Sequence, residues 1–130
     1  MPKVTVHRKA HFNSAHRLYR KDWSNEKNFE VFNKCSNPNF HGHNYELIVS
    51  LTGEIDPETG YVYDLGILKN YIKSEIEEAF DHKNLSVEVP EFDNLNPTAE
   101  NISVVIYGKL RKLLPQHLAL KVTLYETPRN

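Results

Sequence analysis

Three histidines and one cysteine are the residues of this chain whose types and spacing could do chemistry. His41 and His43 are separated by one glycine, His16 precedes them, and Cys35 is the only cysteine. A neutral imidazole is a good ligand for Zn²⁺, and three imidazoles leave one position of a tetrahedral ion open. Because catalysis needs such an open position, this set predicts a catalytic metal site. The alternative is three unrelated histidines with ordinary hydrogen-bond partners.

Cys35 lies in a polar stretch, whereas a structural cysteine usually lies in an apolar one. A thiol acts as a nucleophile or a base only as the thiolate, and a neighbouring zinc ion or imidazolium favours that form. We therefore expect a reactive thiol beside the metal. Two alternatives stay open from the residues alone. Cys35 is a fourth zinc ligand that closes the site, or it is an incidental loop residue.

Four acidic or hydroxyl residues and one further histidine are weaker candidates. Asp81 precedes His82, and a carboxylate can fix the tautomer of an imidazole, although a histidine at a helix C-terminus is the simpler interpretation. Glu126 ends an apolar alternation, so it needs a partner, such as paired N–H donors of a ligand, unless it reaches solvent. Thr98 and Glu100 begin a helical segment, where capping is the simpler interpretation.

Two long alternating segments must position the histidines. Residues 3–16 and 41–52 each alternate apolar and polar side chains, which is typical of half-buried strands. Residues two apart on a strand project from one face, so His41 and His43 point the same way. If the two strands pair as an antiparallel ribbon, His16 can lie on that face as well.

The remaining segments complete an α+β pattern. Two helices have apolar stripes, namely Leu65, Leu68, Ile72, Ile76 and Ala79 in the first, and Ile102, Val105, Ile106, Leu110 and Leu113 in the second. The expected elements are a polar loop over 17–40, a turn over 53–60, a short strand over 61–63, a helix over about 65–80 capped by Asp64, a loop over 81–96, a second helix with Asn96 as its cap and Pro97 in its first turn, and a strand over 118–126. We expect a single domain, 1–130, with an antiparallel four-stranded sheet and two helices packed on one face.

The composition argues against several functions. The 16 Lys and Arg residues against 17 Asp and Glu residues give a net charge of −1, which offers no basic surface for nucleic acid or a membrane. No window has the apolar length of a transmembrane helix. The N-terminal residues lack the apolar run of a signal peptide, and one cysteine forms no internal disulfide, so we expect a cytoplasmic protein.

Six motifs in order resemble the 6-pyruvoyl-tetrahydropterin synthase family. They are Ser14-Ala15-His16-Arg17-Leu18, Cys35 with five residues before His41-Gly42-His43-Asn44-Tyr45, the GEIDPETG turn from Gly53 to Gly60, Asp81-His82-Lys83-Asn84-Leu85, Pro97-Thr98-Ala99-Glu100-Asn101, and Glu126-Thr127. The resemblance extends from about residue 5 to the C-terminus. Six ordered motifs are far more specific than one His-Gly-His.

The resemblance implies the tunnelling fold, in which three subunits join their sheets into a barrel. Two barrels stack as a homohexamer, a dimer of trimers, with active sites between subunits. It implies zinc on the residues that match the family's ligands, His16, His41 and His43. The implied substrate is 7,8-dihydroneopterin triphosphate, from which the family's lyase reaction expels triphosphate. Mg²⁺ on that triphosphate is a further candidate ion, which the sequence does not decide.

The resemblance also implies roles for the other candidates. Cys35 matches the family's catalytic base, and Asp81 and His82 match the pair that assists it. Glu126 matches the carboxylate that anchors the pterin ring. Glu100, and Thr98 beside it, match positions near the pterin pocket.

Three other functions stay open at this stage. A 6-carboxytetrahydropterin synthase of 7-deazaguanine and queuosine synthesis uses the same substrate but releases acetaldehyde, and the five residues between Cys35 and His41 favour the pyruvoyl branch over it. A zinc- or pterin-binding protein without turnover would use Cys35 as a fourth ligand. A different tunnelling-fold enzyme would share the pterin-anchoring glutamate but lack the three histidines.

Overall fold

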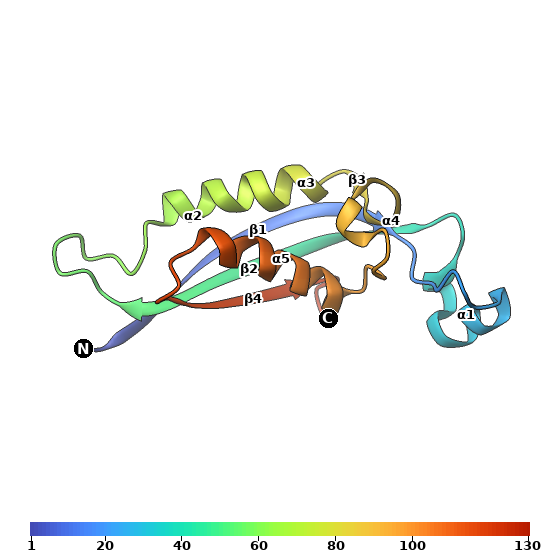
Figure 1. Cartoon of the computed structure of the whole chain (residues 1–130), viewed down its shortest axis with the longest axis horizontal. Helices are drawn as coiled ribbons and strands as arrows, with labels where there is room; N and C mark the ends of the chain where they lie inside the picture. Colours follow the sequence, from blue (N-terminus) through green and yellow to red (C-terminus); the bar gives the residue numbers. More distant parts are fainter.

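The computed structural model describes residues 1–130 as a four-stranded sheet with helices over one face (Figure 1). The strands lie in the order β3-β1-β2-β4. Their bounds are Lys3–His16 for β1, His41–Glu54 for β2, Lys83–Asn84 for β3 and Ala119–Tyr125 for β4. The helices are α1 Asn25–Phe32, α2 Leu65–Ile72, α3 Glu78–Phe80, α4 Leu85–Glu88 and α5 Ala99–Leu113. The expected α+β class is confirmed.

β1 and β2 form the antiparallel ribbon that the two alternating segments predict. Lys3 pairs with Glu54 at one end of the ribbon, and His16 pairs with His41 at the other. β4 is antiparallel to β2, whereas the short β3 is parallel to β1. Residues directly opposite each other on neighbouring strands point to the same face, so this register places His16 beside His41.

A nearly continuous helical segment from Leu65 to Phe80 lies on the sheet, as the apolar stripe predicts. Its Asp64 cap is confirmed, because Oδ1 accepts a hydrogen bond from the Gly66 amide at 2.8 Å. A π-helical turn over Lys73–Glu77 separates α2 from α3. This wider turn shifts the stripe by one position, so Phe80 is fully buried where Ala79 was expected.

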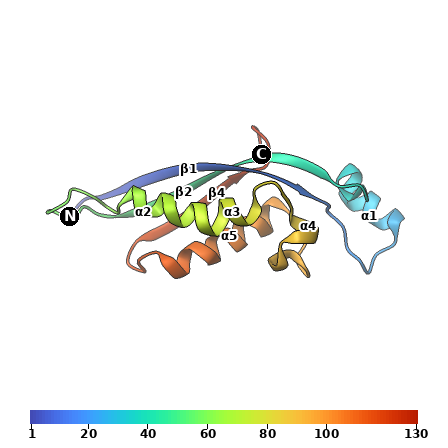
Figure 2. The same cartoon turned by 90° about the horizontal axis from the view of Figure 1, so that it is seen from above.

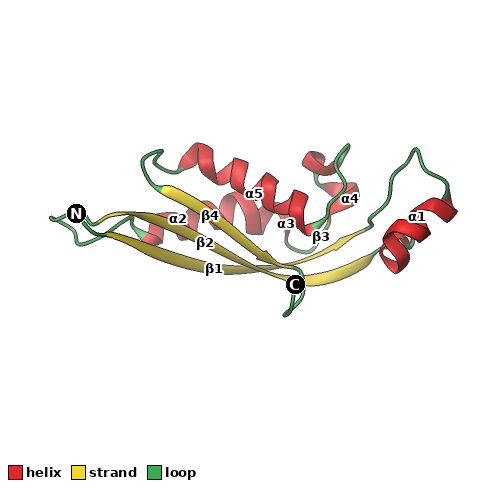
Figure 3. Ribbon diagram, turned by 90° about the horizontal axis from the view of Figure 1, so that it is seen from below, coloured by secondary structure: helices red, strands yellow, loops and turns green.

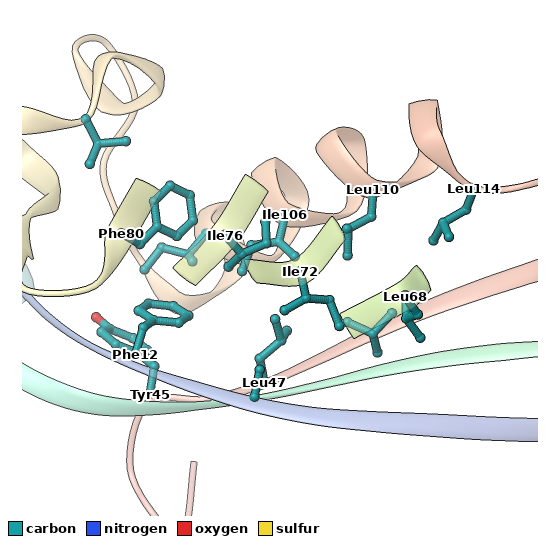
Figure 4. Packing of buried hydrophobic residues seen from close by; sticks show 14 of the residues in the cluster. Phe12, Tyr45, Leu47, Leu68, Ile72, Ile76, Phe80, Ile106, Leu110 and Leu114 are labelled. Atoms are coloured by element: carbon teal, nitrogen blue, oxygen red, sulfur yellow. The ribbon is translucent and has the colours of Figure 1, made fainter. Parts of the chain in front are cut away.

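The core lies between the sheet and the layer of α2, α3 and α5 (Figure 3). The rings of Phe12 and Tyr45 stack with centroids 4.9 Å apart, and Phe80 meets Phe12 edge-on at 5.6 Å. Other buried members of this core are Leu47, Leu68, Ile72, Ile76, Ile106, Leu110 and Leu114 (Figure 4). Each such side chain contributes roughly 1.5–3 kcal/mol, so this core fixes the ribbon that carries the histidines.

The segment 17–40 was expected as a loop but contains a helix. α1 begins after Ser24, whose side chain accepts from the Lys27 amide, and a 3₁₀ turn follows over Asn33–Ser36. Figures 1 and 2 show α1 beyond the end of the sheet, away from the other helices. The sequence did not reveal α1 because it packs on no core and has no continuous apolar stripe, with Phe29 exposed.

Three other element predictions are wrong. Residues 61–63 form no strand; the fourth strand is β3, within the segment 81–96 that was expected as a loop and that also contains α4. A two-residue strand has no periodicity to detect. α5 begins later than expected, because Thr98 and not Asn96 is its cap, with Oγ1 accepting from the Asn101 amide at 3.1 Å.

The second face of the sheet has no helix over it (Figure 2). Polar side chains lie on this face. The Thr5 and Thr52 hydroxyls lie 2.7 Å apart on this face, and Lys9 pairs with Glu46 at 3.5 Å. We refer to it as the outer face. No helix of the chain combines the length and the apolar composition needed to cross a bilayer.

Candidate metal centre

His16, His41 and His43 converge at the end of the β1–β2 ribbon. One ring nitrogen from each lies within 4.8 Å of the others. The ring centroids are 4.5 Å apart for His16 and His41, 5.1 Å for His16 and His43, and 5.0 Å for His41 and His43. The structure thus brings the three residues predicted from the sequence close enough to share one ion.

The hydrogen bonding of these rings fits a metal. Four buried ring nitrogens have no hydrogen-bond partner, namely His16 Nε2, His41 Nδ1, His41 Nε2 and His43 Nε2. Such unpartnered buried atoms are rare in proteins. His16 Nδ1 lies 2.8 Å from the Pro97 carbonyl, which can only accept, so Nδ1 carries the hydrogen and Nε2 keeps its lone pair. A backbone carbonyl that fixes the tautomer in this way is typical of metal-binding histidines.

Burial favours the neutral form of His16 and of His41. It lowers the pKa of His16 from 6.5 to about 4, against the opposing effect of the bond to Pro97 and with a further contribution from the charges of His41 and His43. Burial and His43 also lower the pKa of His41, while the Glu126 carboxylate raises it. Because metals bind the neutral imidazole, these rings are ready to act as ligands at neutral pH.

Tyr45 and Glu126 lie beside the cluster, and the turn that carries Cys35 is bonded to the chain just beyond His16. The Tyr45 hydroxyl lies 3.2 Å from His16 Nδ1, and Glu126 Oε1 lies 3.7 Å from His43 Nε2. Burial raises the pKa of the Tyr45 phenol, and the negative charges of Glu126 and Cys35 raise it further. The Leu18 amide, two residues beyond His16, donates to the Cys35 carbonyl at 2.8 Å, so the turn that carries the thiol lies at the same end of the ribbon as the histidines.

Cys35 lies in the 3₁₀ turn over Asn33–Ser36 and is half-buried. The group of side chains that could hold one ion consists of the three histidines, without the cysteine. This arrangement favours a thiol beside an open site over a fourth ligand.

Asp81 and His82 pair with each other but face a different part of the chain. His82 Nδ1 lies 2.9 Å from Asp81 Oδ2, and Asp81 Oδ1 accepts from the Asn13 amide at 2.8 Å. Together they border an outer-face hollow with Lys9 and His11. The bond to Asn13 and then the attraction of His82 and His11 lower the pKa of Asp81. Within one chain no hydrogen bond or ion pair joins this pair to the histidine cluster or to Cys35.

Thr98 and Glu100 lie at the start of α5, next to the Pro97 carbonyl that bonds His16. Thr98 is the helix cap, and Glu100 is exposed in the first turn. Sequence reasoning did not identify Pro97 or Tyr45 as partners of His16. A backbone carbonyl leaves no signal in the residue type, whereas Tyr45 is in phase with His43 on the same strand and could have been found.

A half-buried three-histidine centre with a thiol and a carboxylate beside it, on a sheet covered by helices, defines a class of metal-binding enzyme domain. The family model described as 6-pyruvoyl tetrahydropterin synthase matches residues 5–130. The chain belongs to this family.

Individual proteins agree with this assignment. The 6-pyruvoyl tetrahydrobiopterin synthase of Pongo abelii is 49% identical over 128 residues, and that of Homo sapiens is 47% identical over the same length. Both alignments cover 98% of this chain and 88% of the relative. The solved structure of Caenorhabditis elegans 6-pyruvoyl tetrahydropterin synthase superposes with a TM-score of 0.93 at 43% identity, covering 100% of this chain and 93% of that one. The resemblance and the fold predicted from the sequence are confirmed.

Proposed function

We propose that this chain is a zinc-dependent lyase that converts 7,8-dihydroneopterin triphosphate to 6-pyruvoyl-tetrahydropterin with loss of triphosphate. The observation that carries this proposal is the convergence of His16, His41 and His43, with free ring nitrogens, in a member of this family. Two curated relatives that are 47% and 49% identical are named as synthases of this type.

His16, His41 and His43 are the residues that would hold the ion, and an all-nitrogen set with an open side suits Zn²⁺. When bound, zinc polarises oxygens of the substrate's side chain and thereby acidifies the neighbouring C–H bonds. The Pro97 carbonyl and Tyr45 keep the His16 ring in one orientation for this purpose.

Cys35 is the proposed base. Its thiolate takes a carbon-bound proton of the substrate side chain and returns it at a neighbouring carbon as the triphosphate leaves. A cysteine that works as a base must stay reduced, and on this ground we place the protein in the cytoplasm. Glu126 anchors the pterin by accepting two N–H bonds from the amino-pyrimidine edge, a charge-assisted pairing.

We further propose that the working enzyme is a homohexamer whose sites are completed between subunits. Asp81 and His82 assist Cys35 in this proposal, yet they lie apart from it in one chain, so a neighbouring copy has to supply them. Two sheet edges favour such an assembly. β4 has no neighbour on its outer side, and only Ser14 and Ala15 of β1 pair with β3. Unpaired strand edges are templates for pairing with another chain.

The reaction itself is the direct test. Incubation with 7,8-dihydroneopterin triphosphate should release triphosphate and give 6-pyruvoyl-tetrahydropterin by mass spectrometry. Release of acetaldehyde would instead assign the carboxy branch, and an unchanged substrate in the presence of zinc would refute a lyase. Purified protein should carry about one zinc per chain.

Two variants test the residue assignments. Cys35→Ala should keep zinc and fold but lose proton abstraction, and wild-type turnover would remove the thiol from the mechanism. Glu126→Gln should weaken pterin binding far more than zinc binding. Glu46→Gln, an exposed carboxylate on the outer face of β2, is the matched control and should leave both unchanged.

A further inference from the structure

The two residues that follow the metal-binding end of β1 are bonded to the turn that carries Cys35. The Leu18 amide donates to the Cys35 carbonyl at 2.8 Å. Arg17 Nε donates to the Ser36 carbonyl, also at 2.8 Å. Because residues 17 and 18 follow His16 directly, these bonds tie the position of the thiol to the position of a metal ligand.

Arg17 is itself held in place from two sides. Its guanidinium carbon lies 3.8 Å from the centroid of the Tyr19 ring. Its amide donates to Ser86 Oγ at 3.0 Å, and the same hydroxyl donates to the Arg17 carbonyl at 3.4 Å. A planar guanidinium that lies on an aromatic ring points its N–H groups in fixed directions, which the flexible ammonium of lysine cannot do.

The turn that receives these bonds is held together by hydrogen bonds of its own. The buried Ser36 donates its hydroxyl hydrogen to the Asn33 carbonyl at 2.8 Å, and the Asn37 amide donates to the Lys34 carbonyl at 3.1 Å. The turn therefore moves as a unit, and Arg17 and Leu18 set how that unit lies against the end of β1. Of the two hydrogen bonds that Arg17 and Leu18 donate to the turn, the one from Arg17 Nε comes from a side chain and can be removed by substitution.

We infer that Arg17 is a positioning residue that fixes the Cys35 thiol beside the metal centre. The inference rests on the proposed function of Cys35 as the base. Without the bond from Nε the turn keeps a single hydrogen bond to the end of β1, from Leu18, and can rotate about it. The sulfur then leaves its place beside the substrate, while the three histidines and Glu126 stay where they are.

The main test compares Arg17→Met with Arg20→Met as the matched control. Methionine keeps the apolar length of the side chain but has no N–H. Arg20 belongs to the same segment, and its guanidinium bonds the exposed Asp22 instead. In Arg17→Met, kcat for triphosphate release should fall about 100-fold, because an error of about 1 Å in a reacting group has effects of that size. KM should change less than about threefold and zinc content should not change, while Arg20→Met should behave as wild type.

A second readout needs no turnover. Cys35 is the only cysteine, so mass spectrometry of maleimide-treated protein reports on this thiol alone. Loosening the turn should increase its labelling rate by about tenfold or more in Arg17→Met, because labelling follows accessibility. Arg17→Lys should not restore kcat, whereas methylguanidinium added to Arg17→Ala should restore part of it.

The competing explanation is that Arg17 contacts the substrate. Arg17 borders a surface hollow of about 550 Å³ with Tyr19 and Asn96, where an anionic group could lie. A raised KM with unchanged kcat and unchanged labelling would establish that role and overturn ours. Loss of zinc in parallel with activity would also overturn it.

Tyr19→Leu provides an independent variant if Arg17→Met does not fold. It removes the ring under the guanidinium and should change kcat and labelling in the same directions by smaller factors; wild-type values for both would refute the inference. If the wild type shows no turnover, the proposed function fails, and the labelling comparison still decides whether Arg17 positions the thiol.

Discussion

Acidification of the metal-free protein should lower its free energy of unfolding through His16. The folded-state pKa of His16 is about 4, against 6.5 for the unperturbed side chain, because the ring is buried. Between these two values the unfolded chain binds more protons than the folded one, so stability rises with pH. The contribution is complete above pH 6.5 and is lost as the pH falls toward 4.

The size of the effect follows from the two pKa values. On going from about pH 7.5 to about pH 5, His16 alone should remove about 2 kcal/mol of stability. His16 is 0% exposed, so solvent does not screen the interactions that set this difference in stability.

The assay is urea unfolding of chelator-treated protein over this pH range. His16→Asn cannot titrate, so the stability difference between wild type and this variant should shrink by about 2 kcal/mol on acidification. His11→Asn, which removes an exposed histidine of the same strand, should keep the wild-type dependence. Adding one equivalent of zinc should steepen the wild-type curve, because protons and metal compete for the same nitrogen. Parallel curves for wild type and His16→Asn would refute the reasoning.

Three further predictions concern neighbouring residues. Phe40 has a φ of +67°, a conformation that favours glycine. In thermal unfolding, Phe40→Gly should therefore be more stable than Phe40→Ala by about 1 kcal/mol. At Glu46, which lies in a regular strand, Glu46→Ala should instead be more stable than Glu46→Gly. Tyr45→Phe removes the hydroxyl beside His16 and should weaken zinc binding about tenfold in a chelator competition, and equal affinities would contradict this role. The buried Asn28 side chain bonds both the amide and the carbonyl of Arg20. Asn28→Leu should therefore make the segment 20–24 sensitive to limited proteolysis, with little change in the free energy of unfolding of the sheet. Unchanged cleavage would contradict this role.

Much of the fold could be predicted because its main elements bury one face each. Alternation with period two marks β1, β2 and β4, and an apolar stripe marks the helical segment from Leu65 to Phe80. The elements that were missed bury little or are too short for a period. α1 is largely exposed, and β3 has only two residues.

The same reasoning explains which site residues could be found from the sequence. Strand geometry alone puts His41 and His43 on one face, and the phase of the first strand brings His16 to the same face. These positions depend on local periodicity and on one strand pairing, both of which the sequence pattern determines.

The tertiary structure alone decided how these groups are oriented and completed. The Pro97 carbonyl that selects the His16 tautomer comes from a loop far along the chain, and Arg17 reaches the Cys35 turn only because the intervening segment folds back. The same is true of Asp81 and His82, which the fold places by the outer face and away from the histidines. Contacts between distant segments depend on packing and on the path of loops, and neither leaves a periodic signal in the residues that take part.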